Sequence, residues 1–263
     1  MSELIPGVDL AISFDGVSMQ FLVISGEKQG KSATVGTTLV NYPQPGMQPL
    51  YLAFDETGPL SCLKLGYQAH RINVPKMPGK NILEKAREGM MRIESNIARI
   101  KQQYGAIIVD CASTMVTSFH ALASQSKNPD TRSHFGDTLI WSKEMYDRLD
   151  RLSMPIWWLA WQRDAETVEE KNQGGQKVTK LLYGGPNIMG NFRSFLAGKV
   201  QHIFILEKQN VGKGAPGADE DGFARVFHTR DHANVRAGGR FQHLLPPVIP
   251  AHCGQIMRVC LGR

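Results

Sequence analysis

Short apolar runs alternate with amphipathic stretches over the first 160 residues of the chain. Four runs have the length of buried strands, and a polar residue follows each of them: residues 21–24, 50–54, 106–109 and 155–161. Continuous apolar runs of this length are typical of strands covered on both faces, as in a parallel sheet. The alternation therefore predicts an α/β fold, with a mostly parallel central sheet and helices on both of its faces.

Helices and loops fill the stretches between these strands. Residues 33–40 and 138–152 predict two helices, and residues 80–104 predict a longer one, because apolar side chains recur there at three- and four-residue spacings. These side chains belong to Ile82, Ala86, Met90, Ile93, Ile97 and Ile100. Residues 123–137 are polar and turn-rich, and residues 164–180 are almost wholly polar, so both predict loops.

The second half of the chain carries fewer signals. Residues 200–207 and 224–229 predict two further strands, joined by a glycine-rich link over residues 212–222. No internal repeat or sharp linker divides the sequence. We therefore expect a single domain over residues 1–263.

Composition supports a globular chain and argues against a membrane protein. Hydrophobic residues make up 42% of the sequence and charged residues 21%, which allows a sizeable core. The apolar runs are far shorter than the roughly 20 residues of a membrane-spanning helix. The first residues lack the basic start and apolar run of a signal peptide. We expect a cytoplasmic protein with no membrane partner.

The cysteines indicate the redox compartment of the protein, and the net charge indicates the class of partner that it could bind. The four cysteines are scattered without a CxxC pair, which argues against a disulfide framework or a zinc–cysteine site and fits a reducing compartment. The formal net charge is +6, and a basic balance favours a polyanion such as nucleic acid. Many basic proteins bind no nucleic acid, so the charge alone leaves both interpretations open.

The segment SGEKQGKS, residues 25–32, is the strongest chemical signal. It matches the phosphate-loop pattern GxxxxGK[ST], with Ser25 in place of the first glycine. In such a loop, backbone N–H groups surround the phosphates, the Lys31 ammonium reaches the β- and γ-phosphates, and the Ser32 hydroxyl ligates Mg²⁺. A chance match in a turn is the alternative, but a strand before the segment and a helix after it favour a site for ATP and Mg²⁺. The predicted nucleotide contacts are Gly26, Glu27, Lys28, Gln29, Gly30, Lys31, Ser32 and Ala33.

Polar residues at the ends of three apolar runs provide candidate partners for this loop. Asp110 follows residues 106–109, where a carboxylate holds the hydration shell of the metal in P-loop enzymes. Glu56 is the first candidate for the general base and Asp55 the second, although this segment also fits a surface turn. Gln162 follows the fourth run, where an amide can sense the γ-phosphate or be an ordinary polar strand end.

In this order, the phosphate loop, the acidic strand end, Asp110 and the strand–Gln162–loop segment resemble the RecA-like ATPase core. In that family, a glutamate after the second strand activates water, and a glutamine after the fourth strand couples the nucleotide to a mobile DNA-binding loop. The resemblance gives catalytic roles to Lys31, Glu56 and Gln162. It identifies residues 164–180 as the DNA-binding loop.

The sequence most resembles the small phage-encoded RecA-like ATPases of single-strand annealing recombination, also described as phage nucleotide-binding AAA-domain proteins. The segments 183–190 and 224–241 follow their layout. The resemblance covers about residues 18–241 and leaves residues 242–263 as a C-terminal extension. Ser25 departs from the loop pattern, and Asp55 and Glu56 are adjacent where RecA-like chains space their acids by one residue.

This resemblance implies cofactors, partners and further site residues. The cofactors are ATP and Mg²⁺, and the main partner is single-stranded DNA. The chain would work as a homo-oligomeric ring or filament, together with a single-strand-binding protein, in the host cytoplasm if it is phage-encoded. Arg236 and Arg240 are candidates for acting on a neighbouring subunit's nucleotide, or belong to a solvated basic turn. The candidates for DNA binding are Arg163, Lys171, Lys177 and Lys180, which also fit an ordinary charged loop.

Two other functions compete with this interpretation. A small-molecule P-loop kinase needs a lid with several arginines, and the polar segment after Gln162 has only Arg163. A non-hydrolysing accessory protein would bind nucleotide as a regulatory ligand. His228 and His232 have no third metal ligand near them in the sequence, so no metal site is predicted there. Core packing is favoured over base stacking for Trp157, Trp158 and Trp161.

Overall fold

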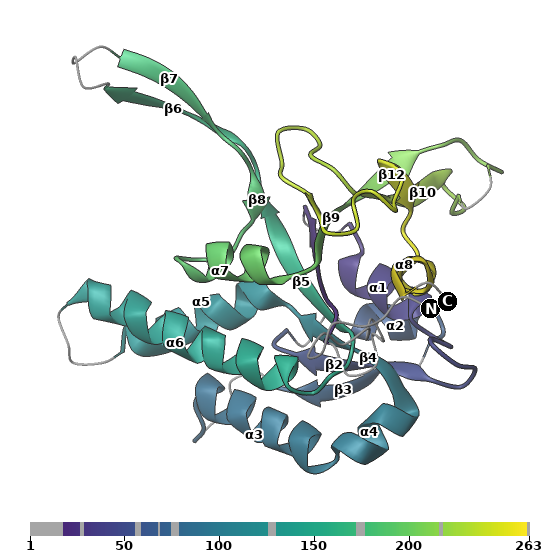
Figure 1. Ribbon diagram of the computed structural model, residues 1–263, viewed down its shortest axis with the longest axis horizontal. Coiled ribbons are helices and arrows are strands. Elements are labelled where there is room, and N and C mark those ends of the chain that lie inside the picture. Colours follow the sequence, from purple (N-terminus) through teal and green to yellow (C-terminus); the bar gives the residue numbers. More distant parts are fainter. Residues whose placement is uncertain are drawn as a thin grey trace, which may run out of the picture.

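A mixed ten-stranded sheet runs through the centre of the molecule (Figure 1). The computed structural model describes residues 18–26, 29–55, 59–67, 69–74, 79–125, 130–171, 177–215 and 218–261. The main strand order is β12-β10-β9-β1-β5-β4-β2-β3, with β11 paired to β9 and β8 paired to β5. Within this order, the neighbours β9, β1, β5, β4, β2 and β3 pair in parallel. The strands β10 and β12 extend the sheet in antiparallel pairing.

Six of these strands, β1, β2, β4, β5, β9 and β10, lie at the predicted strand segments, and the other four were not predicted. The bounds of the strands are β1 Gln20–Ser25, β2 Gln48–Ala53, β3 His70–Asn73, β4 Tyr104–Asp110, β5 Ile156–Arg163, β8 Gly185–Pro186, β9 His202–Asn210, β10 Phe223–His228, β11 Gly238–Gly239 and β12 Val248–Pro250.

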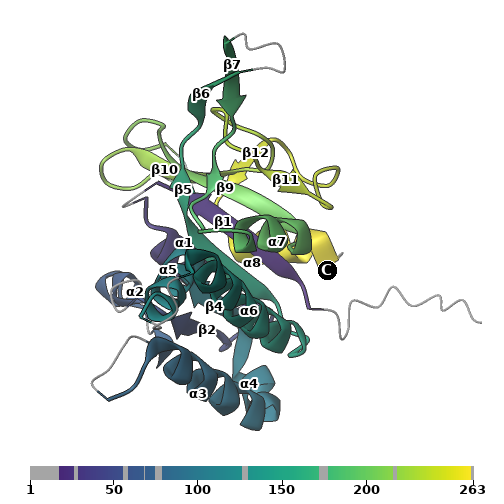
Figure 2. The ribbon, with the colours of Figure 1, turned by 90° about the vertical axis from the view of Figure 1, so that its left-hand side faces the viewer.

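Helices cover both faces of the sheet (Figures 1 and 2). One face carries α3 Ile82–Ser95, α4 Ile97–Gln103, α5 Ala112–Ala123, α6 Thr131–Asp150 and α7 Phe192–Lys199. The other face carries α1 Lys31–Thr38, α2 Leu60–Lys64 and α8 Cys253–Leu261. The expected α/β architecture, a mostly parallel sheet with helices on both faces, is confirmed. Its strand order is compatible with a RecA-like core.

Strand β1 shows why the sheet has two cores. Leu22 and Ile24 face the α3–α7 layer, and Phe21 and Val23 face the α1–α8 layer, because successive side chains on a strand point to opposite faces. All four are fully buried. A strand between two covered faces has no polar side, and the continuous apolar run in the sequence reflects this.

The neighbouring strand β5 carries three tryptophans, and one of them lies differently from the expectation. Trp157 stacks on Phe21 at 4.6 Å in one core, and Trp158 lies in the other core, where its indole nitrogen donates to Gln20 Oε1 at 2.7 Å. Core packing is therefore right for these two residues. It is wrong for Trp161, which is 39% exposed at the carboxyl end of the strand.

The predicted helix over residues 80–104 is divided. It ends at Ser95 and resumes at Ile97, and Tyr104 already belongs to β4. The break falls at Asn96, whose side-chain amide donates to the carbonyl of Arg92 at 2.9 Å. Asparagine competes with the helical backbone in this way, and the periodicity of the apolar positions does not reveal it.

Two predicted loops contain regular structure. Within residues 123–137, the helix α6 already begins at Thr131, with the Asp130 carboxylate accepting from the Arg132 N–H as an N-cap. Within residues 164–180, the strands β6 Glu166–Lys171 and β7 Lys177–Leu182 form an antiparallel hairpin that projects from the sheet (Figures 1 and 2). A projecting hairpin buries no continuous face, so it lacks the alternation that marks a half-buried strand.

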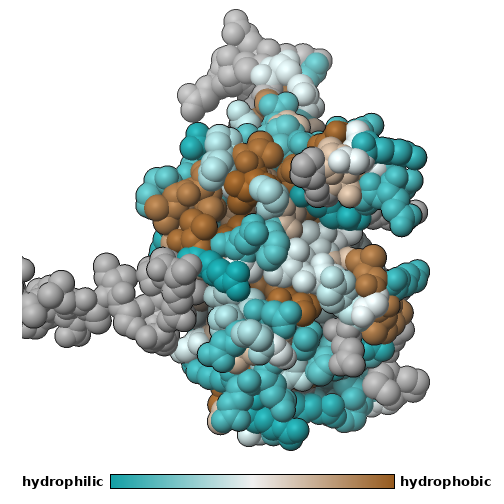
Figure 3. Space-filling view, turned by 90° about the vertical axis from the view of Figure 1, so that its right-hand side faces the viewer, coloured by the Kyte–Doolittle hydropathy of each residue, from teal (hydrophilic) through white to brown (hydrophobic). Residues whose placement is uncertain are grey.

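No helix in the described part of the chain is long and apolar enough to cross a membrane. The face seen in Figure 3 mixes hydrophilic areas with several separate apolar patches.

We expect Gly36→Ala to lower the free energy of unfolding by about 1–3 kcal/mol, because a Cβ there would overlap the Tyr51 hydroxyl and press on Cys62 Sγ. The helical Gly136 has open space around it, so Gly136→Ala should be neutral or stabilising by up to about 1 kcal/mol. Urea denaturation of both variants measures the contrast. Equal effects of the two substitutions would show that α1 is not packed tightly against β2.

Candidate functional site

The phosphate-loop segment connects the end of β1 to the start of α1. Residues 27 and 28 lie outside the described residues, so the predicted contacts of Glu27 and Lys28 are not located. Gly30 precedes α1 with φ +81°, and a Cβ at this position would come within 3.0 Å of Arg225 Nε. The positive φ favours a glycine here, and a Cβ would in addition crowd the Arg225 side chain.

Lys31 and Ser32 open the helix under this loop. The Lys31 ammonium is almost buried and donates to the carbonyls of Ser25 and Gly26, both at 3.2 Å. The hydroxyl of Tyr51, on β2, donates to the carbonyl of Ser32 at 2.7 Å. This bond fixes the first turn of α1 against the sheet, and the next residue, Ala33, is buried beneath it.

Asp110 ends β4 beside this helix start. Burial raises the pKa of Asp110 to about 6; the nearby charge of Asp55 adds to the rise, while a hydrogen bond from Ser32 and the charge of Lys31 oppose it. Its Oδ2 atom is buried and has no hydrogen-bond partner among the residues that the structure describes. A buried carboxylate oxygen without a partner carries a desolvation cost, which a bound cation would offset.

The donor set at this point fits Mg²⁺. The Ser32 hydroxyl and the unpartnered Asp110 oxygen are hard oxygen ligands at the start of α1, and Mg²⁺ prefers such oxygens together with water and phosphate. When bound, Mg²⁺ would neutralise charge on the phosphates.

A pocket of about 400 Å³ lies over this part of the sheet edge. It is lined by Gly30, Lys31, Ser32, Asp55, Leu60, Ser61, Lys64, Asp110, Cys111 and Trp161. Residues that the sequence placed at the ends of three separate apolar runs therefore meet around one opening. Glu56, the first candidate for the base, lies outside the described residues, next to Asp55 in the chain.

Gln162 lies near the phosphate loop but in a second pocket, of about 210 Å³, which Gly26 and Gln29 also line. Its side-chain amide donates to Asp164 Oδ1 at 3.1 Å. The strand β5 continues through Gln162 to Arg163 rather than ending before them. The amide is therefore held at the end of a strand of the central sheet.

A third pocket, of about 570 Å³, lies at the base of the β6–β7 hairpin and gathers three arginines. Arg163, Arg193 and Arg236 all line it, and the Arg236 guanidinium lies 5.0 Å from the centre of the Tyr183 ring. The Nε atom of Arg163 is buried without a partner in the described part of the chain. The backbones of Lys171, Lys177 and Lys180 lie on the two hairpin strands.

Arg240 lies at the opposite edge of the sheet from the phosphate loop of its own chain. Its N–H donates to the carbonyl of Gln201, which precedes β9, and β9 runs parallel to β1. The amino ends of these strands are therefore its neighbours. Neither Arg240 nor Arg236 lines the pocket around Lys31, and a role toward a second subunit stays a prediction.

Three residues near these pockets were missed in the sequence. Arg225, on β10, donates to the carbonyl of Gln29 at 3.4 Å and contacts Gly30. It stands 196 residues from Gln29, and no local motif marks it. Trp161 was assigned to the core, and Arg193 lies on the helix α7 without a basic cluster around it in the sequence.

Comparisons with known proteins add little to this geometry. No protein-family model and no curated protein sequence matches the chain. Among solved structures, a KaiC-like protein from the hyperthermophilic archaeon Pyrococcus horikoshii OT3 is similar over 81% of this chain and 77% of its own, with 10% sequence identity and a TM-score of 0.42. Similarity at this level carries no argument, so the site stands on the geometry of this chain.

We expect Asp110→Asn to stabilise the nucleotide-free protein near pH 7 by about 1–3 kcal/mol, because it removes a buried charge. The pKa of Asp110 is about 6 in the folded protein against an ordinary 3.8, so the folded chain binds the proton more tightly than the unfolded chain. Wild-type stability therefore falls as the pH rises from about 4 to about 6, and then levels.

Thermal denaturation of both proteins near pH 4.5 and near pH 7 measures this effect. The stabilisation by Asp110→Asn should shrink at the lower pH. A difference of equal size at both pH values would mean that Asp110 does not titrate between them.

Proposed function

We propose that the chain is a RecA-like P-loop ATPase that binds single-stranded DNA and acts in recombination by strand annealing. The observation that carries the ATPase part is the single pocket that Lys31, Ser32, Asp55 and Asp110 line together. Such a pocket holds a cation for the phosphates, a hydroxyl and a carboxylate for Mg²⁺, and a second carboxylate beside them. These are the parts that phosphoryl transfer to water requires.

Each of these side chains has a distinct task in this reaction. The Lys31 ammonium exchanges the carbonyls of Ser25 and Gly26 for phosphate oxygens, because all of them compete for the same N–H donors. Ser32 and Asp110 would hold Mg²⁺, and a cation there would favour the ionised form of Asp110. Glu56, or Asp55 in second place, orients and deprotonates the attacking water.

Arg225 contributes a second cation next to the loop. Its guanidinium bonds the Gln29 carbonyl and lies against Gly30 in the same chain. A positive charge next to this loop would stabilise negative charge that develops on bound phosphates. We therefore assign it to nucleotide binding in cis, beside any arginine that a second subunit supplies.

The DNA-binding part of the proposal is supported by the pocket at the base of the hairpin. Three arginines supply phosphate contacts there, and Tyr183 offers an aromatic face on which a base can stack. The unpartnered Nε of Arg163 gains a hydrogen bond when a phosphate oxygen enters. The predicted DNA contacts Lys171, Lys177 and Lys180 belong to the strands of the hairpin that begins here.

Three consecutive residues of β5 link the two sites. Trp161 lines the nucleotide pocket, Gln162 the pocket beside the phosphate loop, and Arg163 the arginine pocket. If this strand end moves when the γ-phosphate is lost, Arg163 moves with it. Hydrolysis would reset the affinity for DNA in this way. We further propose that the chain acts as a homo-oligomer together with a single-strand-binding protein.

We expect ATP hydrolysis by the wild type to rise when single-stranded DNA is added, and Lys31→Ala to lower the rate by about two orders of magnitude or more. The measurement is phosphate release with and without an oligothymidylate. Hydrolysis that ignores DNA would contradict the DNA part of the proposal and turn attention to a small acceptor. No hydrolysis despite ATP binding would contradict the ATPase part.

We expect Arg193→Ala and Arg236→Ala each to weaken binding of a fluorescent oligothymidylate and to reduce the slope of log affinity against log salt by about 0.7. The matched control is Arg258→Ala, an exposed arginine on α8 at the other face of the sheet. Fluorescence anisotropy at several salt concentrations measures both quantities. Loss of affinity in the control equal to that in the two variants would show that binding follows net charge alone.

A further inference from the structure

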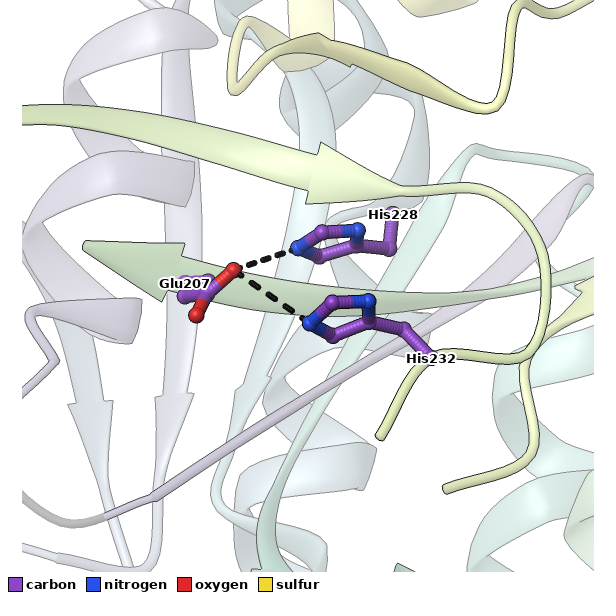
Figure 4. A group of neighbouring side chains, drawn as sticks. All are labelled: Glu207, His228 and His232. Atoms are coloured by element: carbon purple, nitrogen blue, oxygen red, sulfur yellow. Dashed lines mark hydrogen bonds and ion pairs between the residues drawn. The ribbon is translucent and has the colours of Figure 1, made fainter. Parts of the chain in front are cut away.

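The strands β9 and β10 bring three metal-ligating side chains together, Glu207, His228 and His232 (Figure 4). Glu207 Oε2 lies 2.6 Å from His228 Nε2 and 3.6 Å from His232 Nε2. The two imidazole rings stack with their centres 3.6 Å apart. No third ligand stands near the histidine pair in the sequence, and the structure brings one to it from 21 residues before His228, Glu207.

The backbone fixes all three positions. In the antiparallel pairing of β9 with β10, Glu207 is opposite Val226 and His228 is opposite Ile205, so the side chains of Glu207 and His228 are diagonal neighbours on one face. His232 returns to this face through a tight turn, in which it exchanges two backbone hydrogen bonds with Val235.

The Glu207 carboxylate is held in place by a neighbouring side chain. The Gln209 amide donates to Oε2 at 2.9 Å. Outer hydrogen bonds of this kind hold a ligating oxygen in place.

The cluster is accessible from one side. The His228 side chain is 5% exposed, whereas those of Glu207 and His232 are 40% and 42% exposed. Glu207 and His232 line the pocket that also contains Gly26, Gln29 and Gln162. An ion entering from this pocket reaches both exposed ligands first and the buried one last.

We propose that Glu207, His228 and His232 form a binding site for one divalent cation of the zinc class, separate from the Mg²⁺ site at Ser32 and Asp110. Bond lengths of about 2.0–2.2 Å on a tetrahedral ion place ligand atoms about 3.3–3.6 Å apart. The three ligand atoms lie within 4.8 Å of one another, so small side-chain rotations suffice. Two imidazoles and one carboxylate suit Zn²⁺ rather than Mg²⁺. The fourth position faces the pocket and takes water.

A cation here joins segments that are distant in sequence. It would tie β9 and β10 to the turn after His232, and Val235 of that turn pairs with Gly184 at the base of the hairpin. The following residue, Arg236, lines the arginine pocket. The ion therefore stabilises the folded chain and the edge of that pocket, and this holds whether or not the chain hydrolyses ATP.

The test is direct binding of Zn²⁺ and Co²⁺ to the full chain, without a polyhistidine tag and without nucleotide or DNA. All four cysteines of the chain are buried and do not compete. Competition with a chromogenic chelator should give one Zn²⁺ per chain, and Co²⁺ should show the visible absorption of a four-coordinate site.

His232→Ala and Glu207→Gln, which alter exposed ligands, should each weaken binding at least about 100-fold. Zn²⁺ should raise the Tm of the wild type but not of these variants.

His243→Ala is the control, because it removes an exposed histidine outside the cluster. It should bind as the wild type does, and circular dichroism should show that all variants are folded. Binding of less than one ion per chain, or equal affinity in the wild type and His232→Ala, would overturn the proposal and leave the cluster as a hydrogen-bonded group. Since no nucleotide is present, failure here would leave the proposed ATPase function untouched.

Discussion

The parallel pairing of β1 between β5 and β9 is the constraint on which the rest of the molecule depends. Parallel strands present their carboxyl ends at one edge, and in open α/β sheets the loops at that edge hold the ligand. Here the edge receives the phosphate loop from β1, Trp161 to Arg163 from β5, Asp110 from β4 and Glu207 from β9. Burial of β1 on both faces holds this arrangement, since a one-residue slip would exchange the side chains that pack in the two cores.

The same burial makes the site electrostatically costly before a ligand arrives. Asp110 has a raised pKa and an oxygen with no partner among the described residues, and the Lys31 ammonium donates to two backbone carbonyls. Under the proposed function, a phosphate and its cation would relieve the desolvation cost of Asp110 and give Lys31 an anionic partner.

The positions of the pockets explain how one ligand can influence another. Three adjacent residues at the end of β5 reach three separate pockets, so the nucleotide site and the arginine pocket are connected by a strand rather than by a long loop. The turn after His228 also connects two pockets, because His232 and Val235 line the second pocket and Arg236 lines the third. The coupling that the proposed function requires would therefore run through a few elements that share one sheet edge.

The sequence by itself determined the buried strands, the phosphate loop and the polar residues that follow the apolar runs, because each depends on neighbours within a few positions. The helix break at Asn96 and the helix start at Asp130 were not predicted, because hydrogen bonds of single side chains end or start helices without changing the apolar period. The hairpin after Gln162 was not predicted, because strands that bury no face show no alternation of apolar and polar residues.

Only the tertiary structure decided which distant side chains meet. Arg225 reaches Gln29 across 196 positions, and Glu207 reaches His228 across 21, through strand pairing that no motif records. The exposed position of Trp161 likewise follows from where the helices stop covering β5. Local chemistry fixes what each segment can do, whereas the order of strands in the sheet fixes which segments act together, because that order is set by packing over the whole core.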